Sequence, residues 1–134
     1  MRLQLTRRAD YAIRAMLVLA SDPDAIVSGQ EIARQVDIPE RLVTQVMGRL
    51  VHAQLISARL GRHGGYRLAR PAREIPMLTI VEAVEGDSRR QRCVLRGLPC
   101  DPAEHCLVHE IFAGAQEALI ERLAAASLGS ALEK

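Results

Sequence analysis

A three-residue break between two short amphipathic segments constrains the fold of this chain most strongly. Ser28 and Glu31 form a capping box, in which the Ser28 hydroxyl accepts from the Glu31 amide and the Glu31 side chain reaches back to Ser28. We therefore expect a helix over residues 30–36 and, after the break Asp37-Ile38-Pro39, a second helix over residues 40–53. Two short helices joined by so tight a turn predict a helix-turn-helix, in which the second helix reads DNA.

The segments on either side of this unit complete a winged fold. Thr6 is placed to cap a helix over residues 6–20. Residues 55–59 and 66–68 have the pattern of two strands, and a glycine-rich turn joins them. Arginines stand at the base and the tip of this β-hairpin, which is typical of a wing that lies along DNA.

The remaining chain predicts two more helices and a loop. Thr79 and Glu82 form a second capping box, which begins a short helix that ends at Gly86. A long helix over residues 103–128 has an apolar face too wide for the chain left to cover it, so we expect a homodimer. The predicted fold class is mainly α with a small β-hairpin: a winged helix-turn-helix plus a long C-terminal dimerisation helix. Its units are a DNA-binding domain at 1–76, a short helix and cysteine-bearing loop at 77–102, and the dimerisation helix and tail at 103–134.

Charge divides the chain into a basic and an acidic part. Residues 1–73 carry 12 arginines against 6 acidic residues, a net charge of +6, whereas residues 74–134 have a net charge of −4. This asymmetry indicates a polyanionic partner for the first part, namely a double-stranded DNA operator. With no Trp, one Phe and two Tyr, the chain lacks the aromatic rings on which single-stranded nucleic acid stacks.

Membrane association and export are not expected. No apolar run approaches the roughly 18 residues of a membrane span. The N-terminus has arginines but no apolar segment followed by a small-residue cleavage site. We expect a cytoplasmic protein with no membrane partner.

Six polar side chains of the predicted winged unit are candidate DNA contacts. Arginine pairs bidentately with guanine and glutamine with adenine, while threonine and serine serve base edges or phosphate. The candidates at the helix starts, on the second helix and in the wing are Ser28, Arg41, Thr44, Gln45, Arg59 and Arg62. The alternative for all of them is an ordinary solvated surface.

Three cysteines lie within fourteen residues and read C-x6-C-x5-C: Cys93, Cys100 and Cys106. An odd number of thiols makes a poor disulfide framework, whereas thiolates select iron–sulfur clusters, zinc or copper(I). His109 follows Cys106 by three residues, so both are expected to project from one helix face toward one metal centre. Zinc, a thiol redox switch and cysteines without any metal remain the alternatives.

Several motifs together resemble the Rrf2 family of bacterial regulators over essentially the whole chain. They are the opening Met-Arg-Leu, the run at 8–15, the hairpin Gly61-Arg62-His63-Gly64-Gly65-Tyr66 and residues 80–86. The resemblance implies a homodimeric winged-helix transcription factor with dimer contacts along the last helix. In cluster-binding members, three cysteines of this loop hold an iron–sulfur cluster that tunes DNA binding.

The chain departs from the family pattern at two places. Leu60-Gly61 enters the wing where the family usually has Arg-Gly, so any minor-groove arginine is a neighbour, Arg59 or Arg62. The first cysteine gap is six residues where five is common, which leaves the cluster type open.

The resemblance offers two candidates for a fourth cluster ligand. His109 looks like the histidine of the family's iron–sulfur biogenesis regulator, which completes a 2Fe–2S cluster. Asp10 looks like the carboxylate ligand of the family's nitric-oxide sensor, which holds 4Fe–4S, and it would reach across from the N-terminal domain, of the same or the other subunit. His109 and 2Fe–2S are favoured slightly over Asp10 and 4Fe–4S. The alternatives are an Asp10–Arg14 pair within one helix and a surface histidine at 109.

These observations predict a sequence-specific DNA-binding repressor, not an enzyme. An iron–sulfur cluster that senses iron–sulfur status, nitric oxide or redox state would control its affinity for the operator. A cluster-free or zinc/thiol-switch regulator of the same fold is the alternative. A small iron–sulfur redox protein is disfavoured, because the chain has no C-x2-C pair and no catalytic constellation.

Overall fold

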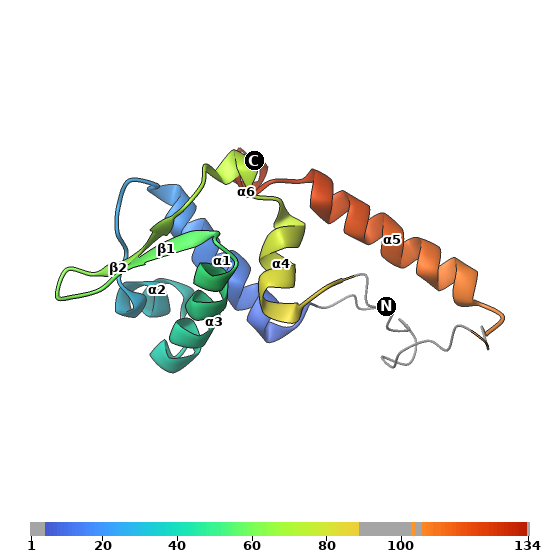
Figure 1. Cartoon of the computed structure of the whole chain (residues 1–134), viewed down its shortest axis with the longest axis horizontal. Coiled ribbons are helices and arrows are strands. Elements are labelled where there is room, and N and C mark those ends of the chain that lie inside the picture. Colours follow the sequence, from blue (N-terminus) through green and yellow to red (C-terminus); the bar gives the residue numbers. More distant parts are fainter. Residues whose placement is uncertain (1–4, 89–102, 104–105, 134) are drawn as a thin grey trace.

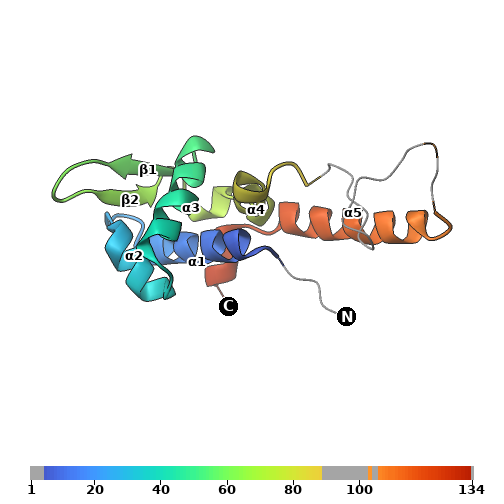
Figure 2. The ribbon, with the colours of Figure 1, turned by 90° about the horizontal axis from the view of Figure 1, so that it is seen from below.

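The computed structural model describes residues 5–88, 103 and 106–133 of the 134-residue chain. Three helices, an antiparallel pair of strands and three further helices follow one another along these residues as a winged helix-turn-helix. This confirms the predicted fold class. In both views α5 extends away from the other elements, and its N-terminal end is the one that lies farther from them (Figures 1 and 2). The elements are α1 Arg7–Ser21, α2 Gly29–Val36, α3 Glu40–His52, β1 Ile56–Arg59, β2 Gly65–Leu68, the 3-10 turn η1 Ala72–Glu74, α4 Met77–Glu85, α5 His109–Ala125 and α6 Leu128–Leu132.

Side-chain caps begin the first two helices as predicted. The Thr6 hydroxyl accepts from the Ala9 amide at 3.2 Å, and the Ser28 hydroxyl accepts from the Glu31 amide at 3.1 Å. The second half of the capping box at Ser28 is wrong. The Glu31 carboxylate accepts instead from Arg34 Nε at 2.9 Å and from Gln35 Nε2 at 2.7 Å, because both side chains lie on its own face of α2.

The capping box predicted at Thr79 is also wrong. Helix α4 begins two residues earlier, at Met77, with Pro76 as N-cap and no side-chain cap. The Met77 amide donates to the carbonyl of Ala126 at 2.8 Å, so a distant segment satisfies a donor that a cap would otherwise serve.

The predicted last helix over 103–128 is two helices in the described chain. Helix α5 begins at His109 and ends at Ala125, and α6 begins at Leu128. Ser127 causes the break, because it caps α6 through reciprocal bonds with Ser130. Leu128 is fully buried and its amide donates to the carbonyl of Ile75 at 2.8 Å. These contacts fix α6 to the winged helix and α4, and these elements together with α6 are called the body below.

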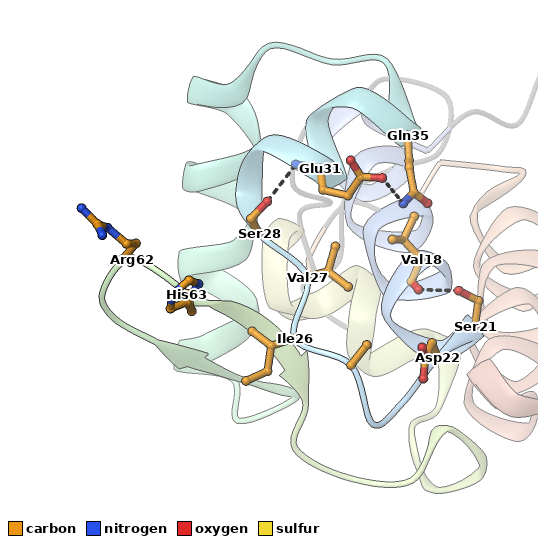
Figure 3. A pocket seen from close by; sticks show the side chains of 12 residues that line it. Val18, Ser21, Asp22, Ile26, Val27, Ser28, Glu31, Gln35, Arg62 and His63 are labelled. Atoms are coloured by element: carbon orange, nitrogen blue, oxygen red, sulfur yellow. Dashed lines mark hydrogen bonds between the residues drawn. The ribbon is translucent and has the colours of Figure 1, made fainter.

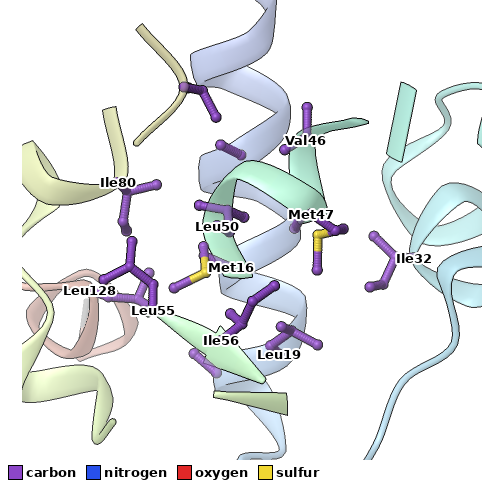
Figure 4. Packing of buried hydrophobic residues seen from close by; sticks show 14 of the residues in the cluster. Met16, Leu19, Ile32, Val46, Met47, Leu50, Leu55, Ile56, Ile80 and Leu128 are labelled. Atoms are coloured by element: carbon purple, nitrogen blue, oxygen red, sulfur yellow. The ribbon is translucent and has the colours of Figure 1, made fainter. Parts of the chain in front are cut away.

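One aliphatic core joins the winged helix to the elements that follow it. Met16, Met47, Leu50, Ile80 and Leu128 belong to the same buried cluster, and Figure 4 shows them converging from α1, α3, α4 and α6. Burying a side chain of this size contributes roughly 1.5–3 kcal/mol. The proposed division of the chain at residue 76 stays a prediction, and this cluster contains residues from both sides of that point.

The hairpin is held against the start of α2. Its register pairs Ile56 with Leu68 and Arg59 with Gly65. The Val27 amide donates to the Tyr66 carbonyl at 3.0 Å, and the Tyr66 amide donates back to Val27 at 2.8 Å.

A glycine is required at 64, because a Cβ there would collide with the Arg59 carbonyl.

Within the described ranges, no helix is both long enough and apolar enough to cross a membrane.

Candidate nucleic-acid interface and cysteine segment

Helix α3 separates a buried face from an exposed, polar one. Val43, Val46, Met47 and Leu50 point into the core. Three candidate DNA contacts, Arg41, Thr44 and Gln45, lie exposed on the opposite side. The Thr44 hydroxyl donates to the Glu40 carbonyl at 3.2 Å, so it meets a ligand as an acceptor unless it rotates. The helix therefore presents donors and acceptors to solvent within its first two turns, where a reading helix meets base edges.

Ser28 has a structural role before any contact with DNA. Its half-buried side chain is the N-cap of α2, and its backbone follows directly on Val27, which pairs with the wing. The serine thus lies at the junction between the first helix of the helix-turn-helix and the segment that pairs with the hairpin.

Both candidate DNA-contacting arginines of the wing are exposed. Arg59 is the last residue of β1, and Arg62 stands in the turn. Figure 3 shows the Arg62 side chain directed away from an open hollow of about 580 Å³. This hollow lies between the end of α1, the start of α2 and the wing tip, and its polar lining includes Ser28 and Glu31.

The strongest pKa effect in this region belongs to Glu31. Hydrogen bonds, first from Arg34 and then from Gln35, lower the pKa of Glu31 from 4.5 to about 2. The carboxylate is therefore ionised at any physiological pH, and it places a fixed negative charge beside the basic surface.

The structure describes only part of the predicted metal site. Cys93 and Cys100 lie outside the described residues. Cys106 is exposed, and its carbonyl accepts from the His109 amide at 3.0 Å. The prediction that Cys106 and His109 share a helix face is wrong, because α5 begins only at His109 and Cys106 stands in the turn before it.

Asp10 is paired within its own helix. Its carboxylate accepts from Arg14 Nε at 2.9 Å, the i,i+4 alternative noted from the sequence. The first turn of α1, which contains Asp10, lies on the body, while α5 begins at the far end of the molecule (Figures 1 and 2). Among the residues that are described, no group of three or more His, Cys, Asp or Glu is arranged to hold a metal ion.

Helix α5 exposes apolar side chains that the described chain does not cover. Ile111 is 70% exposed and Leu119 is 45% exposed, whereas only Ile120 of this helix is buried. Leu107 and Val108, just before the helix, are exposed as well. Large apolar side chains exposed together along one segment are typical of a protein–protein contact.

The anchor of the wing on Val27 was not predicted from the sequence. The signal in the sequence is the apolar run Ala25-Ile26-Val27, directly before the Ser28 cap, which is typical of an extended segment. Its bonds to Tyr66 join the wing to the helix-turn-helix, so both are presented to a ligand as one surface.

A helix-turn-helix with a reading helix, an anchored wing and exposed arginines defines a DNA-binding transcription regulator. Residues 5–134 match the family described as Rrf2, iron-dependent transcriptional regulator. The chain belongs to the Rrf2 family, as its motifs indicated. Members of this family are transcriptional regulators that bind DNA, and no catalytic function is indicated.

Individual relatives resemble the chain along most of its length. The HTH-type transcriptional repressor NsrR of Streptomyces coelicolor is 29% identical over 123 residues, which cover 90% of this chain and 82% of NsrR. The structure of IscR from T. potens has a TM-score of 0.78 at 25% identity, over 98% of this chain and 87% of IscR. CymR, the global cysteine regulator of B. subtilis, has a TM-score of 0.81 over 96% of this chain and 95% of CymR; at 22% identity it shows the fold alone.

Proposed function

We propose that this protein is a homodimeric repressor whose affinity for its operator depends on an iron–sulfur cluster held by Cys93, Cys100 and Cys106. The observation that carries the proposal is the connection from Cys106 to the DNA-binding body. Cys106 lies three residues before the start of α5, and α5 leads into α6, whose Leu128 belongs to the same buried cluster as Met47 of α3. A change at the cysteines therefore has a covalent and packed route to the reading helix.

The donor set fits a cluster chemically. Three thiolates are soft ligands, and with one imidazole or carboxylate they make the four protein ligands that an iron–sulfur cluster takes. His109, three residues after Cys106, is the favoured fourth ligand, together with a 2Fe–2S cluster. Asp10, of the same or the other subunit, is the alternative. When bound, the cluster supplies a centre that reacts with oxidants and nitric oxide. The family's description as iron-dependent supports this assignment.

DNA recognition is divided between α3 and the wing. Arg41 and Gln45 are exposed and placed to read base edges in the major groove, with Thr44 between them. Arg59 and Arg62 contact phosphates or the adjacent minor groove, and Ser28 contacts phosphate at the start of α2. Paired copies of this surface fit an operator with two half-sites separated by about one helical turn, roughly 34–36 Å.

Switching follows from a two-state arrangement of the C-terminal region. With all three thiolates joined at one centre, Cys106 holds the start of α5 in a fixed position; with the thiolates separated, it does not. The two positions of α5 place the reading helices of the dimer at different spacings, and the operator fits one of them.

Anaerobic purification with absorption and Mössbauer spectra tests the cofactor, and operator binding by holo and apo protein tests the switch. We expect an iron–sulfur spectrum and a difference of at least tenfold in affinity. The Cys106→Ser variant should lose the spectrum and bind DNA as apo wild type does. Equal affinities of holo and apo protein would contradict the switch, and a colourless iron-free protein would contradict the cofactor.

Two variants identify the fourth ligand. His109→Ala should alter or abolish the cluster spectrum, whereas Asp10→Ala should leave it unchanged. His63→Ala, an exposed histidine in the wing, is the matched control. The reverse result would assign the ligand to Asp10, and if neither variant altered the spectrum both assignments would be wrong.

A cluster-free regulator of the same fold is the second candidate. It is favoured by the fold shared with CymR, which is described as a cysteine regulator, and by the exposed thiol of Cys106. In that case iron and zinc are absent from the purified protein, and oxidation of the thiols alone changes its affinity for DNA.

A further inference from the structure

We propose that Leu60 is an apolar minor-groove contact. The wing inserts this side chain into the minor groove of operator DNA, beside the major groove read by α3, and the inserted side chain bends the duplex there. The proposal rests on the proposed DNA-binding function and adds a specificity-determining residue to the six predicted contacts. Leu60 stands between the end of β1 and the turn at Gly61.

The position of Leu60 in the wing sets it apart from the rest of the exposed apolar surface. Its side chain is 94% exposed. The other large exposed hydrophobic residues of the described chain lie along α5, just before it or near the two ends: Leu5, Leu107, Val108, Ile111, Leu119 and Leu132. Contacts along α5 therefore do not account for an uncovered leucine on the wing.

The position of Leu60 is fixed by the backbone around it. The Gly64 amide closes the turn by donating to the Gly61 carbonyl at 3.0 Å. Near the tip end of its paired strands, the hairpin is bonded to Val27 by two hydrogen bonds, one from and one to Tyr66. A wing anchored in this way presents its tip in one orientation relative to α2 and α3, so Leu60 is preorganised for a ligand.

Charge and shape indicate that this ligand is DNA. In both views the hairpin projects beyond the helices, on the side of the molecule where α2 lies (Figures 1 and 2). Exposed Arg59 and Arg62 flank Leu60 and are suited to the phosphates on the two sides of a groove. With the arginines on the phosphates, the leucine between them faces the base edges.

An apolar wedge in a minor groove has a known physical consequence. Leucine is among the side chains that partly unstack a base step and kink the duplex toward the major groove. Pyrimidine–purine steps such as TA and CA kink most easily, so the operator should carry one of them beneath the wing. Specificity at that step arises from the deformability of the DNA, because leucine has no hydrogen bond to offer.

The test uses the full chain, prepared anaerobically with and without reconstituted iron and sulfide. Its probes are the duplex that the wild type selects from a random double-stranded library and an unselected duplex of the same length. Affinity is measured for both, and the bend is measured by energy transfer between dyes at the ends of the selected duplex. The variants are Leu60→Ala, Leu60→Arg and the control Leu132→Ala, which truncates a 44% exposed leucine in α6.

We expect Leu60→Ala to bind the selected duplex about tenfold more weakly and to bend it less, with unchanged affinity for the unselected duplex. Leu60→Arg should strengthen binding to the unselected duplex through its added charge without restoring the bend. Leu132→Ala should behave as the wild type. Because Leu60 makes little contact with the protein, its replacement should leave the melting temperature unchanged.

Two results overturn the proposal while the proposed function stands. One is a Leu60→Ala protein that binds and bends the selected duplex as the wild type does. The other is an equal loss of affinity for both duplexes, which would make Leu60 a general contact. If instead the wild type selects no sequence in either preparation, the proposed function fails and the role of Leu60 fails with it.

Discussion

The body of the molecule and helix α5 both carry many apolar side chains, but they differ in how far they bury them. In the body, α1, α3, α4 and α6 bury their apolar faces against one another in a single cluster. In α5 only Ile120 is buried, and Ile111 and Leu119 remain exposed. The difference teaches that an apolar pattern specifies a helix without specifying what covers it. The described chain covers the body, whereas it leaves Ile111 and Leu119 of α5 exposed. The homodimer proposed above would cover them with another copy of the chain.

The largest effect should come from a cavity in the body. Leu50→Ala removes a fully buried side chain of α3 and should lower the free energy of unfolding by about 2–5 kcal/mol. Leu119→Ala, the same change at an exposed site on α5, should cost much less at low protein concentration. Urea denaturation of both variants measures the difference. Equal losses would break the comparison, because α5 would then be as well covered as the body.

A charge on α5 should have the next largest effect. Ile111→Glu places a carboxylate on the exposed apolar face and should weaken self-association by about 2–3 kcal/mol, roughly a hundredfold. Sedimentation equilibrium measures this constant. Glu110→Gln, a change at the neighbouring exposed position, is the control and should leave association intact. A dimer that survives Ile111→Glu unchanged would mean that α5 is not the interface.

The same comparison explains which features could be predicted from the sequence. The hydroxyl caps at Thr6 and Ser28 are local, because the bonded amide lies three residues away, and both are confirmed. The return bond predicted from the Glu31 side chain to Ser28 is wrong. The start of α4 is not local, since the Met77 amide is satisfied by Ala126, which no pattern near Met77 reveals. Sequence patterns therefore predicted elements well where short-range bonds decide them.

The candidate site divides in the same way. The exposed face of α3 follows from helical spacing, and Arg41, Thr44 and Gln45 are exposed as expected. The shared helix face of Cys106 and His109 failed, because spacing alone does not fix where α5 begins. The ligand set and the DNA contacts stay predictions, since they depend on partners outside the chain.

A change on the reading face should cost less than either core or interface changes. Arg41→Ala removes an exposed donor from the first turn of α3 and should weaken operator binding by about 1–3 kcal/mol, with relaxed preference at one base pair. Arg49→Ala, at an exposed position in the last turn, is the matched control and should have a smaller effect. Fluorescence anisotropy on single-base variants of the operator measures both. If Arg49→Ala lost more specificity, the reading positions would have to be reassigned toward the end of α3.

The smallest effect should come from a surface pair of the body. Because bonds from Arg34 and Gln35 lower the pKa of Glu31 to about 2, the folded state binds a proton less readily than the unfolded state, whose value is 4.5. The contribution of Glu31 to stability is therefore complete above pH 4.5 and is lost as the pH falls toward 2. It should be small, because the group is exposed and water and salt screen it. Nuclear magnetic resonance titration of the Glu31 carboxyl should give the low value, and Arg34→Gln should raise it toward 4.5 while hardly changing the melting temperature at pH 7. A large loss of stability at pH 7 in Arg34→Gln would show that surface charges, and not the aliphatic core alone, distinguish the body from α5.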